Sequence, residues 1–312
     1  MKLLLSDMTP LVELDLPDDV EVVAFNERER VPDEHRDAEA IVLWGTVNPD
    51  LTSFFADLPR LGWVQSYMAG PDAIMSARLP DDVVVTKGQN FHDQTVAEHA
   101  LTLVLAQVRR LPEAAVAQAE HRWARELGGV QALHPDDRVT TLIDTPVVVW
   151  GFGAIGQAIA RLLAAFGARV TGLARTPGER AGFPVTDDVD AALAHADVLI
   201  MILPHSDATT GVLNEHTISV LPDRAIVVNV GRGSAVDEDA LVRALRDGRL
   251  GGAGLDVTST EPLPADSPLW DAPNLVLTPH AAGGRPVGAE ERIAHNLRAF
   301  RGDGDFIGRM PR

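Results

Sequence analysis

Residues 145–176 read TPVVVWGFGAIGQAIARLLAAFGARVTGLART, and this stretch decides the fold class of the chain. An apolar run without period 2, typical of a buried strand, is followed by three closely spaced glycines. The residues after them carry an apolar stripe at spacings of three and four, made of Ile155, Ile159, Leu162, Leu163 and Phe166. Gly167 stands where a helix C-cap glycine belongs, and a second apolar run follows it. The stretch therefore predicts strand, glycine turn, helix and strand, which together form one βαβ unit.

The glycine turn has the pattern G-x-G-x-x-G, formed by Gly151, Gly153 and Gly156. This pattern alone is weak evidence, but its place between a strand and a periodic helix is the context that a dinucleotide site requires. Gly151 permits the tight turn, Gly153 lets the backbone approach a pyrophosphate, and Gly156 lets the helix pack against the strand. The helix N-terminus, with Ala154 and Ile155, offers unpaired N–H groups. We expect a dinucleotide cofactor here, and the alternative is an α/β turn without a ligand.

The end of the second strand indicates which dinucleotide is preferred. A site that prefers NAD usually has a carboxylate about 20 residues after the glycines, where it accepts hydrogen bonds from the ribose. Here Ala174 is followed by Arg175 and Thr176, and no carboxylate stands there. An arginine can pair with a 2′-phosphate, and a threonine can add a hydroxyl. The sequence therefore favours NADP(H), with NAD(H) possible if Arg175 is only an exposed strand end.

The rest of the chain predicts an α/β protein with doubly wound parallel sheets. Five apolar runs in the first third are interpreted as buried strands, beginning near Leu3, Val20, Ala40, Trp63 and Val83. Four more follow the βαβ unit: ADVLIMILP, RAIVVNVG, GGAGLDV and NLVLTPH. An apolar helix is expected from Thr95 to about Gln118, with an interruption near Pro112, and His99 on it is interpreted as a hydrogen-bonded core histidine. The last helix is expected from about Gly288 to Arg301.

Three charged residues follow three of these strands: Arg232, Glu261 and His280. Ligands of open α/β sheets bind beyond the carboxyl ends of the strands, so the three side chains can converge there. An arginine binds a carboxylate through two hydrogen bonds, and a histidine gives a proton to a carbonyl oxygen or removes one from a hydroxyl. A glutamate beside that histidine favours its charged form. The set suits hydride transfer between a 2-hydroxy acid and a 2-keto acid, although each residue alone is more often a surface charge or part of a turn.

Composition excludes several other classes of protein. The 312 residues include 45 acidic and 27 basic side chains, which gives a formal net charge of −18. Such a surface repels nucleic acid and anionic lipid, so neither is expected as a partner. Cysteine is absent, which excludes disulfides, thiolate metal sites and cysteine nucleophiles, and no metal site is expected. The first apolar run is too short for a signal peptide and no run is long enough to span a bilayer, so a cytoplasmic protein is expected.

Several separate motifs occur in one order along the chain: VQSYMAG, TVAEH, GFGAIG, VVNVGRGSAVDEDAL, GLDVTSTEPLP and NLVLTPH. In this order the sequence resembles the D-isomer-specific 2-hydroxyacid dehydrogenase family, from Val64 to the last helix. The resemblance implies that Arg232, Glu261 and His280 are the catalytic residues. It also implies that Arg232 and the loop Met68, Ala69 and Gly70 bind the substrate carboxylate. Further implied cofactor contacts are Leu203 and Pro204 at the adenosine half, Val230, and Asp256 near the nicotinamide.

The resemblance also implies an architecture. It comprises two flavodoxin-like or Rossmann-like domains with the active site in the cleft between them. Residues 1–95, completed by 285–312, are expected to form the substrate domain, and residues 96–284 the dinucleotide-binding domain. A homodimer formed through the dinucleotide-binding domain is implied in the same way.

Within this family the sequence is similar to the NADP-preferring glyoxylate and hydroxypyruvate reductases, because the acid after the second strand is missing. Many phosphoglycerate dehydrogenases carry a long C-terminal extension that is not seen here, and formate dehydrogenases have glutamine where Glu261 stands. Two alternatives stay open. One is an NAD(H)-preferring dehydrogenase of another 2-hydroxy acid, such as phosphoglycerate. The other is a dinucleotide-sensing binding protein that resembles the corepressors of this fold.

Overall fold

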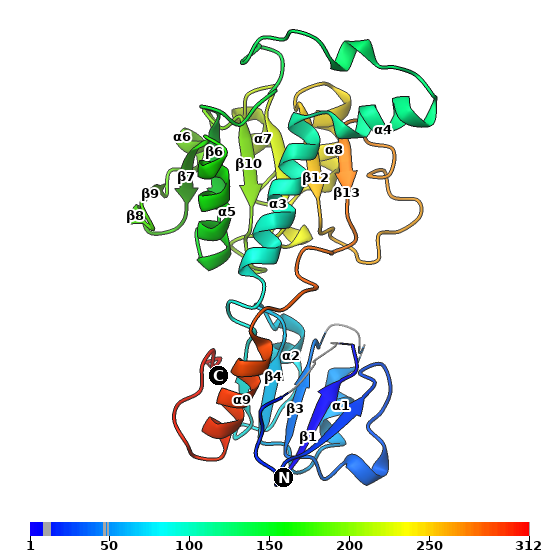
Figure 1. Cartoon of the computed structure of the whole chain (residues 1–312), viewed down its shortest axis with the longest axis vertical. Helices are drawn as coiled ribbons and strands as arrows, with labels where there is room; N and C mark the ends of the chain where they lie inside the picture. Colours follow the sequence, from blue (N-terminus) through cyan, green and yellow to red (C-terminus); the bar gives the residue numbers. More distant parts are fainter. Residues whose placement is uncertain (9–13, 46–47, 49, 312) are drawn as a thin grey trace. The chain divides into compact units, whose positions relative to one another are not determined.

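The computed structural model describes residues 1–8, 14–45, 48 and 50–311, and it divides into two compact units. The N-terminal unit is Met1–His92 with Arg285–Arg312, and the central unit is Asp93–Gly284. Each unit has a sheet with helices on both faces (Figure 1), which confirms the predicted α/β class. The expected boundary after residue 95 falls three residues into helix α3 (Asp93–Val108). In the described part of the chain, no helix combines the length and apolarity needed to cross a membrane.

The central unit contains a sheet in the order β13-β12-β11-β10-β6-β7-β9-β8. The first strand in the sequence, β6, is central; β7, β9 and β8 extend the sheet on one side of it, and β10 to β13 extend it on the other. Its strands are β6 (Pro146–Trp150), β7 (Arg169–Leu173), β8 (Gly178–Arg180), β9 (Phe183–Thr186), β10 (Val198–Met201), β11 (Ile226–Asn229), β12 (Gly252–Leu255) and β13 (Leu275–Leu277). All neighbours pair in parallel except β8 with β9. The order of strands therefore reverses between β6 and β10, which is where ligands of such sheets bind.

The strands of the central sheet end in one row. Trp150 pairs with Leu173 on one side and with Met201 on the other, and the same register continues through β13. The residues that follow the strands therefore stand at one edge: Gly151, Ala174, Ile202, Val230, Asp256 and Thr278. This register brings sequence positions more than a hundred residues apart to a common edge.

Helices cover both faces of the central sheet (Figure 1). Residues Val147 and Val149 of β6 pack with α3 and α5 (Ala154–Ala165), whereas Val148 and Trp150 pack on the opposite side. That side carries α6 (Val189–Leu193), α7 (Glu215–Val220) and α8 (Glu238–Arg246). Because both faces are covered, the inner strands β6, β10, β11 and β12 are buried along almost their whole length rather than alternating.

Some elements differ from the expectation. The long helix is broken before Pro112, at Arg110, whose φ of +52° begins α4 (Leu111–Ala119). Pro112 is accepted in the first turn of α4, where its missing N–H has no helical partner to lose. Phe166 ends the predicted apolar stripe but is exposed at the end of α5. The hairpin β8–β9 was not expected at all.

The N-terminal unit has a fully parallel sheet in the order β2-β1-β3-β4-β5, the order of flavodoxin-like folds. Its elements are β1 (Lys2–Ser6), β2 (Glu21–Phe25), η1 (Asp33–His35), β3 (Ala40–Leu43), α1 (Leu51–Ala56), β4 (Trp63–Ser66), α2 (Asp72–Ser76), β5 (Val84–Thr86) and α9 (Ala289–Phe300). One face packs against α1 and α2, and the other against α9. The sequence suggested that the run at β2 is buried, but β2 is an edge strand and only Phe25 in it is buried.

Helix α9 joins the N-terminal sheet through buried polar side chains. The Asn296 amide donates to Gln65 Oε1 at 2.8 Å, and Thr86 Oγ1 donates to the same oxygen at 2.8 Å. Trp63 Nε1 in turn donates to Thr86 Oγ1 at 2.9 Å. All four side chains are excluded from solvent, so this network specifies how α9 docks.

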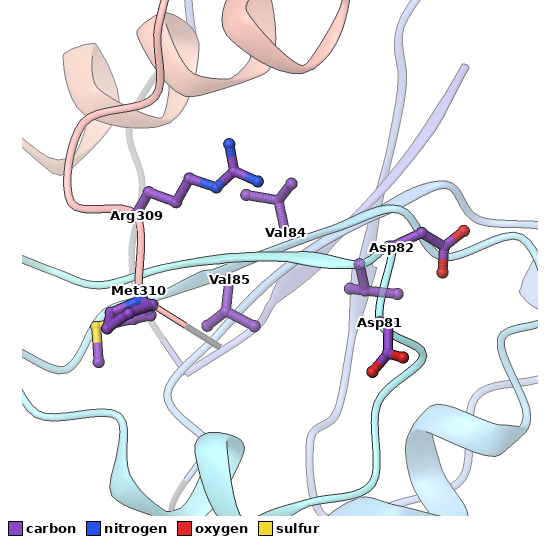
Figure 2. A pocket seen from close by; sticks show the side chains of 8 residues that line it. Asp81, Asp82, Val84, Val85, Arg309 and Met310 are labelled. Atoms are coloured by element: carbon purple, nitrogen blue, oxygen red, sulfur yellow. The ribbon is translucent and has the colours of Figure 1, made fainter.

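A cavity of about 470 Å³ lies beside β5, where the C-terminal segment pairs with that strand (Figure 2). It is lined by residues 81–85 and 309–311. None of the predicted site residues lies in this cavity.

Candidate active site

The glycine turn follows β6 and opens α5. Gly151 has φ +102°, and a Cβ there would lie 2.4 Å from the Ile202 carbonyl oxygen. A Cβ on Gly156 would lie 2.2 Å from the carbonyl oxygen of Gly151. Both positions thus require glycine for the packing of the turn itself. A Cβ on Gly153, in contrast, would meet no atom within 4 Å. Gly153 therefore keeps open the space before the first turn of α5, which fits a pyrophosphate held by the N–H groups of Ala154, Ile155 and Gly156.

A second arginine lies near the end of β7. Arg175 and Thr176 follow Ala174 there, and both side chains are exposed. Arg180 of β8 donates from Nη2 to the Thr176 carbonyl oxygen at 2.8 Å and from Nη1 to the Phe152 carbonyl oxygen at 3.5 Å. It therefore links the glycine turn to the residues that follow β7. The sequence pattern did not indicate Arg180, because the hairpin that carries it gives no strand signal.

The loops after β10 and β11 pack against each other. A Cβ on Gly231 would lie 2.6 Å from the Leu203 nitrogen, so only glycine allows this approach. Leu203 and Val230 are buried, and Pro204, in the loop after β10, is exposed. Buried Asn229 holds the second loop, because its Nδ2 donates to the Arg232 carbonyl oxygen at 2.9 Å and its Oδ1 accepts from Gly231 N–H at 3.0 Å. These bonds fix the backbone at Arg232.

Glu261 and His280 form a hydrogen-bonded pair. His280 Nδ1 lies 2.7 Å from Glu261 Oε2, and the other carboxylate oxygen accepts the Thr258 N–H at 3.1 Å. The loop after β12, which carries Glu261, lies against the loop after β11, which carries Arg232. They meet at Gly233 in the turn η3 (Gly233–Ala235), where a Cβ on Gly233 would lie 2.1 Å from the Thr258 carbonyl oxygen. Since Nδ1 is occupied by the glutamate, Nε2 of His280 is the nitrogen that can exchange a proton with a substrate.

The charges of this site act on one another. The hydrogen bond that His280 donates to Glu261 raises the pKa of His280. Burial and Arg232 act in the opposite direction, and the charges of Glu261 and Asp256 reinforce the rise. Burial alone would raise the pKa of Glu261, but the hydrogen bond and charge of His280 outweigh it and lower that pKa. Arg232 is near enough to influence the pKa of both groups. The structure thus brings Arg232, Glu261 and His280 into one electrostatic site.

Asp256 is almost completely buried, at 2% exposure. Its carboxylate accepts hydrogen bonds from the Thr278 hydroxyl at 2.6 Å and from the N–H groups of Ala281 at 2.8 Å and Ala282 at 3.1 Å. These partners lie on both sides of His280 in the sequence. Asp256 therefore has an internal role in the backbone around His280, and its contact with the nicotinamide stays a prediction.

The predicted carboxylate-binding loop belongs to the N-terminal unit. Met68, Ala69 and Gly70 follow β4 and are half-buried. Met68 N–H donates to Ser66 Oγ at 3.0 Å, and its carbonyl oxygen accepts the Gly88 N–H at 2.8 Å. The loop is thus fastened to its own sheet.

Comparisons with known proteins identify the family of the chain. Residues 101–282 match the D-isomer specific 2-hydroxyacid dehydrogenase, NAD binding domain. A glyoxylate reductase of Thermococcus onnurineus is 34% identical over 282 residues, 88% of this chain and 83% of that protein. A D-3-phosphoglycerate dehydrogenase of Mycobacterium bovis is 31% identical over 317 aligned positions, 98% of this chain and 57% of that protein.

Among solved structures, an NADPH-dependent glyoxylate/hydroxypyruvate reductase of Sinorhizobium meliloti, in complex with NADP and sulfate, is similar with a TM-score of 0.81. It is 26% identical, and the match covers 99% of this chain and 98% of that one. The matching domain family covers more than half of the chain and contains the glycine turn, Arg232, Glu261 and His280. The chain therefore belongs to the D-isomer-specific 2-hydroxyacid dehydrogenase family, and it is an oxidoreductase that acts on the CH–OH group of donors with NAD or NADP.

Proposed function

We propose that this protein reduces small 2-keto acids of the glyoxylate and hydroxypyruvate type to 2-hydroxy acids with NADPH. The observation that carries this proposal is the Glu261–His280 pair, 2.7 Å apart, within the electrostatic reach of Arg232. This site lies at the sheet edge that also holds the glycine turn. The relatives named as glyoxylate reductases support the choice of substrate class.

Each residue of the site has a chemical task in this reaction. The Arg232 guanidinium binds the substrate carboxylate and polarises the neighbouring carbonyl. His280 gives the proton on Nε2 to the carbonyl oxygen, and Glu261 keeps that histidine charged before the transfer. When bound, NADPH supplies the hydride that reduces the carbonyl carbon. The products are therefore the 2-hydroxy acid, NADP⁺ and a neutral His280, which regains its proton from solvent.

The remaining contacts are proposed from their positions. Gly151, Gly153 and the first turn of α5 hold the pyrophosphate. Leu203, Pro204, Val230 and Asp256 lie on the loops along the cofactor path at the same edge. In the N-terminal unit, the loop 68–70 is proposed to bind the substrate carboxylate through the N–H groups of Ala69 and Gly70, because the Met68 N–H donates to Ser66 Oγ.

The preference for NADP is proposed from the cations near β7. Arg175 and Thr176 supply a guanidinium and a hydroxyl for the 2′-phosphate, and the Arg180 guanidinium lies against the Thr176 carbonyl oxygen. The similar structure that contains NADP supports this assignment. No carboxylate stands between Ala174 and Thr176 to repel the phosphate.

The test is the loss of nicotinamide absorbance with NADPH and, separately, with NADH. The substrates are glyoxylate, hydroxypyruvate, pyruvate and phenylpyruvate. We expect faster turnover with NADPH and with the first two acids. Replacement Arg175→Ala should raise the KM for NADPH about tenfold or more and leave that for NADH unchanged, since one charged hydrogen-bonding partner is lost. The matched control is Arg169→Ala, which removes the same charge from the opposite end of β7. A preference for NADH in the wild-type enzyme would refute the assignment of Arg175.

Oxidation of phosphoglycerate is the second candidate function. It is favoured by the phosphoglycerate dehydrogenase that matches 98% of this chain. The same assay with phosphohydroxypyruvate and NADH distinguishes the two, and faster turnover than with glyoxylate would select this candidate. A protein that binds the cofactor but turns over none of these acids would point instead to a dinucleotide sensor.

We also propose a homodimer formed through the central unit. Helix α4 and the segment after it expose large apolar side chains that a monomer rarely shows together: Leu111, Val116, Trp123, Val130 and Leu133. Light scattering coupled to size exclusion measures the mass directly. A mass of one chain at micromolar concentration would reject the dimer.

A further inference from the structure

Helix α3 packs along β12 through residues spaced four apart. Leu103 Cβ lies 3.1 Å from where a Cβ on Gly254 would stand, and Gln107 Oε1 lies 2.6 Å from the same point on Gly252. His99, one step before Leu103, lies against Asp256, one step after Gly254. Four residues of helix rise about 6 Å and two residues of strand about 6.6 Å. These two rises are nearly equal, so the packing of α3 on β12 places His99 beside the carboxylate of Asp256.

The contacts of His99 are made by its Nε2 atom. This nitrogen lies 3.2 Å from Asp256 Oδ1 and 2.9 Å from Thr278 Oγ1. Thr278 already gives its hydroxyl proton to the same carboxylate oxygen, so Nε2 acts as the donor toward both. His99 thus donates to the Asp256 carboxylate from α3, whereas Thr278, Ala281 and Ala282 donate to it from the segment around His280.

The backbone of His280 depends on this carboxylate. His280 has φ +51°, a left-handed conformation that a residue other than glycine adopts only when its surroundings impose it. Its N–H donates to the Asp256 carbonyl oxygen at 2.8 Å. The Asp256 carboxylate also accepts hydrogen bonds from Thr278, which precedes His280, and from the N–H groups of Ala281 and Ala282, which follow it. The segment that carries His280 is therefore held on both sides by one buried residue.

We propose that His99 is a positioning residue for His280, which it aligns by holding the carboxylate of Asp256 through Nε2–H. His99 is fixed by α3, so the bond ties the 278–282 segment to a helix as well as to the strand ends. The proposal rests on the proposed function only for the acid role of His280, because the effect on the backbone is independent of turnover.

The test compares three variants. His99→Leu removes the donor and keeps most of the side-chain bulk, whereas His99→Gln retains an N–H at the same distance from the backbone. Gln107→Leu is the matched control, because it removes two hydrogen bonds from the same face of α3, to the carbonyl oxygens of Ala253 and Asn274, without contact to Asp256. For each variant we would measure kcat, the KM for glyoxylate and NADPH, the Tm, and hydrogen exchange of the Ala281 and Ala282 amides.

His99→Leu is expected to lower kcat about tenfold with each KM within about twofold, the size of effect of one hydrogen bond to a charged group. Exchange at Ala281 and Ala282 should accelerate about tenfold by the same argument. His99→Gln should restore both quantities, and Gln107→Leu should lower the Tm without changing either.

Two results would overturn the proposal. One is a wild-type kcat and wild-type exchange in His99→Leu. The other is a loss in His99→Leu that His99→Gln fails to restore and that Gln107→Leu reproduces, because this would be a packing effect. A wild-type protein that reduces no keto acid would refute the proposed function, and the exchange data would still decide the role of His99.

Discussion

Two histidine–carboxylate pairs lie at the ends of neighbouring strands of the central unit, and they differ in exposure. His280 Nδ1 and Glu261 Oε2 are 2.7 Å apart, with side chains 39% and 38% exposed. His99 Nε2 and Asp256 Oδ1 are 3.2 Å apart, with side chains 20% and 1% exposed. The same two kinds of group therefore meet in two environments. The open pair can exchange protons with a ligand or with water, whereas the buried Asp256 carboxylate is surrounded by hydrogen-bond donors of the protein.

The partners of the two carboxylates point to the same division. Besides its histidine, Glu261 accepts the backbone N–H of Thr258, so its charge is balanced mainly by His280. Asp256 accepts a hydroxyl and two backbone N–H groups besides its histidine. Loss of the Asp256 charge should therefore damage the fold, and loss of the Glu261 charge should alter the titration of His280. Four experiments test this contrast.

The largest effect is expected from His280→Asn. Asparagine tolerates the left-handed backbone of this position but cannot supply a proton as imidazolium does. We expect kcat for keto acid reduction to fall by a factor of about 100 to 10,000, with NADPH binding unchanged by fluorescence titration. Turnover at the wild-type rate would remove His280 from the mechanism.

Asp256→Asn should cost the most stability. An amide NH₂ would replace one of the two oxygens that face N–H and O–H donors, which leaves buried donors without an acceptor. We expect the free energy of unfolding in urea to fall by about 2–3 kcal/mol. The control is Glu261→Gln, the same chemical change in the open pair, for which we expect less than about 1 kcal/mol. Equal losses in the two variants would contradict the division of roles.

Glu261→Gln should instead change the pH dependence of activity. Reduction needs protonated His280, so kcat/KM should fall as the pH rises through the pKa of His280, which lies above its ordinary value. Without the glutamate that pKa drops, and the fall in kcat/KM should move to lower pH. Profiles of kcat/KM against pH for both enzymes measure the displacement. An unmoved profile would mean that Glu261 does not support the charge of His280.

The smallest effect is on stability as a function of pH. The folded-state pKa of His280 is raised, so its contribution is complete below the unfolded value of about 6.5 and is lost as the pH rises through the folded value. Because the pair is partly exposed, this contribution should be below about 1 kcal/mol and should shrink with added salt. Urea unfolding of the wild type and His280→Asn at several pH values measures it as a difference. A difference that grows above that window would have the wrong sign for this pair.

The parts of the site that the sequence predicted share one physical basis. Glycines after a strand and charges after later strands meet because parallel strands in register end in one row, so Gly151, Arg232 and His280 could be grouped without coordinates. Arg180 and His99 could not be grouped in this way. Arg180 reaches the site through a short hairpin of low apolarity, and His99 through the matched spacing of a helix and a strand that lie about 150 residues apart in the sequence.

The fold, too, was predictable where burial leaves a pattern in the sequence and not where a single residue or a strand's neighbours decide. The apolar runs predicted the parallel sheets because burial on both faces leaves a strong signal. The run at β2 carries the same signal although it lies at an edge, since hydrophobicity alone does not report a strand's neighbours. The break at Arg110 depends on one left-handed residue, and the neighbouring Pro112 only marked its vicinity.

The docking of α9 has a consequence for the order in which the molecule is completed on the ribosome. Asn296 supplies a buried partner to Gln65, and α9 covers one apolar face of the N-terminal sheet. The central unit, of about 190 residues, is synthesised after the N-terminal sheet and before α9. Its synthesis takes about 10–40 s at typical translation rates. During that interval the sheet that emerged first has Leu3, Val42 and Trp63 uncovered on that face. The N-terminal unit, although first to leave the ribosome, is thus the last to finish folding.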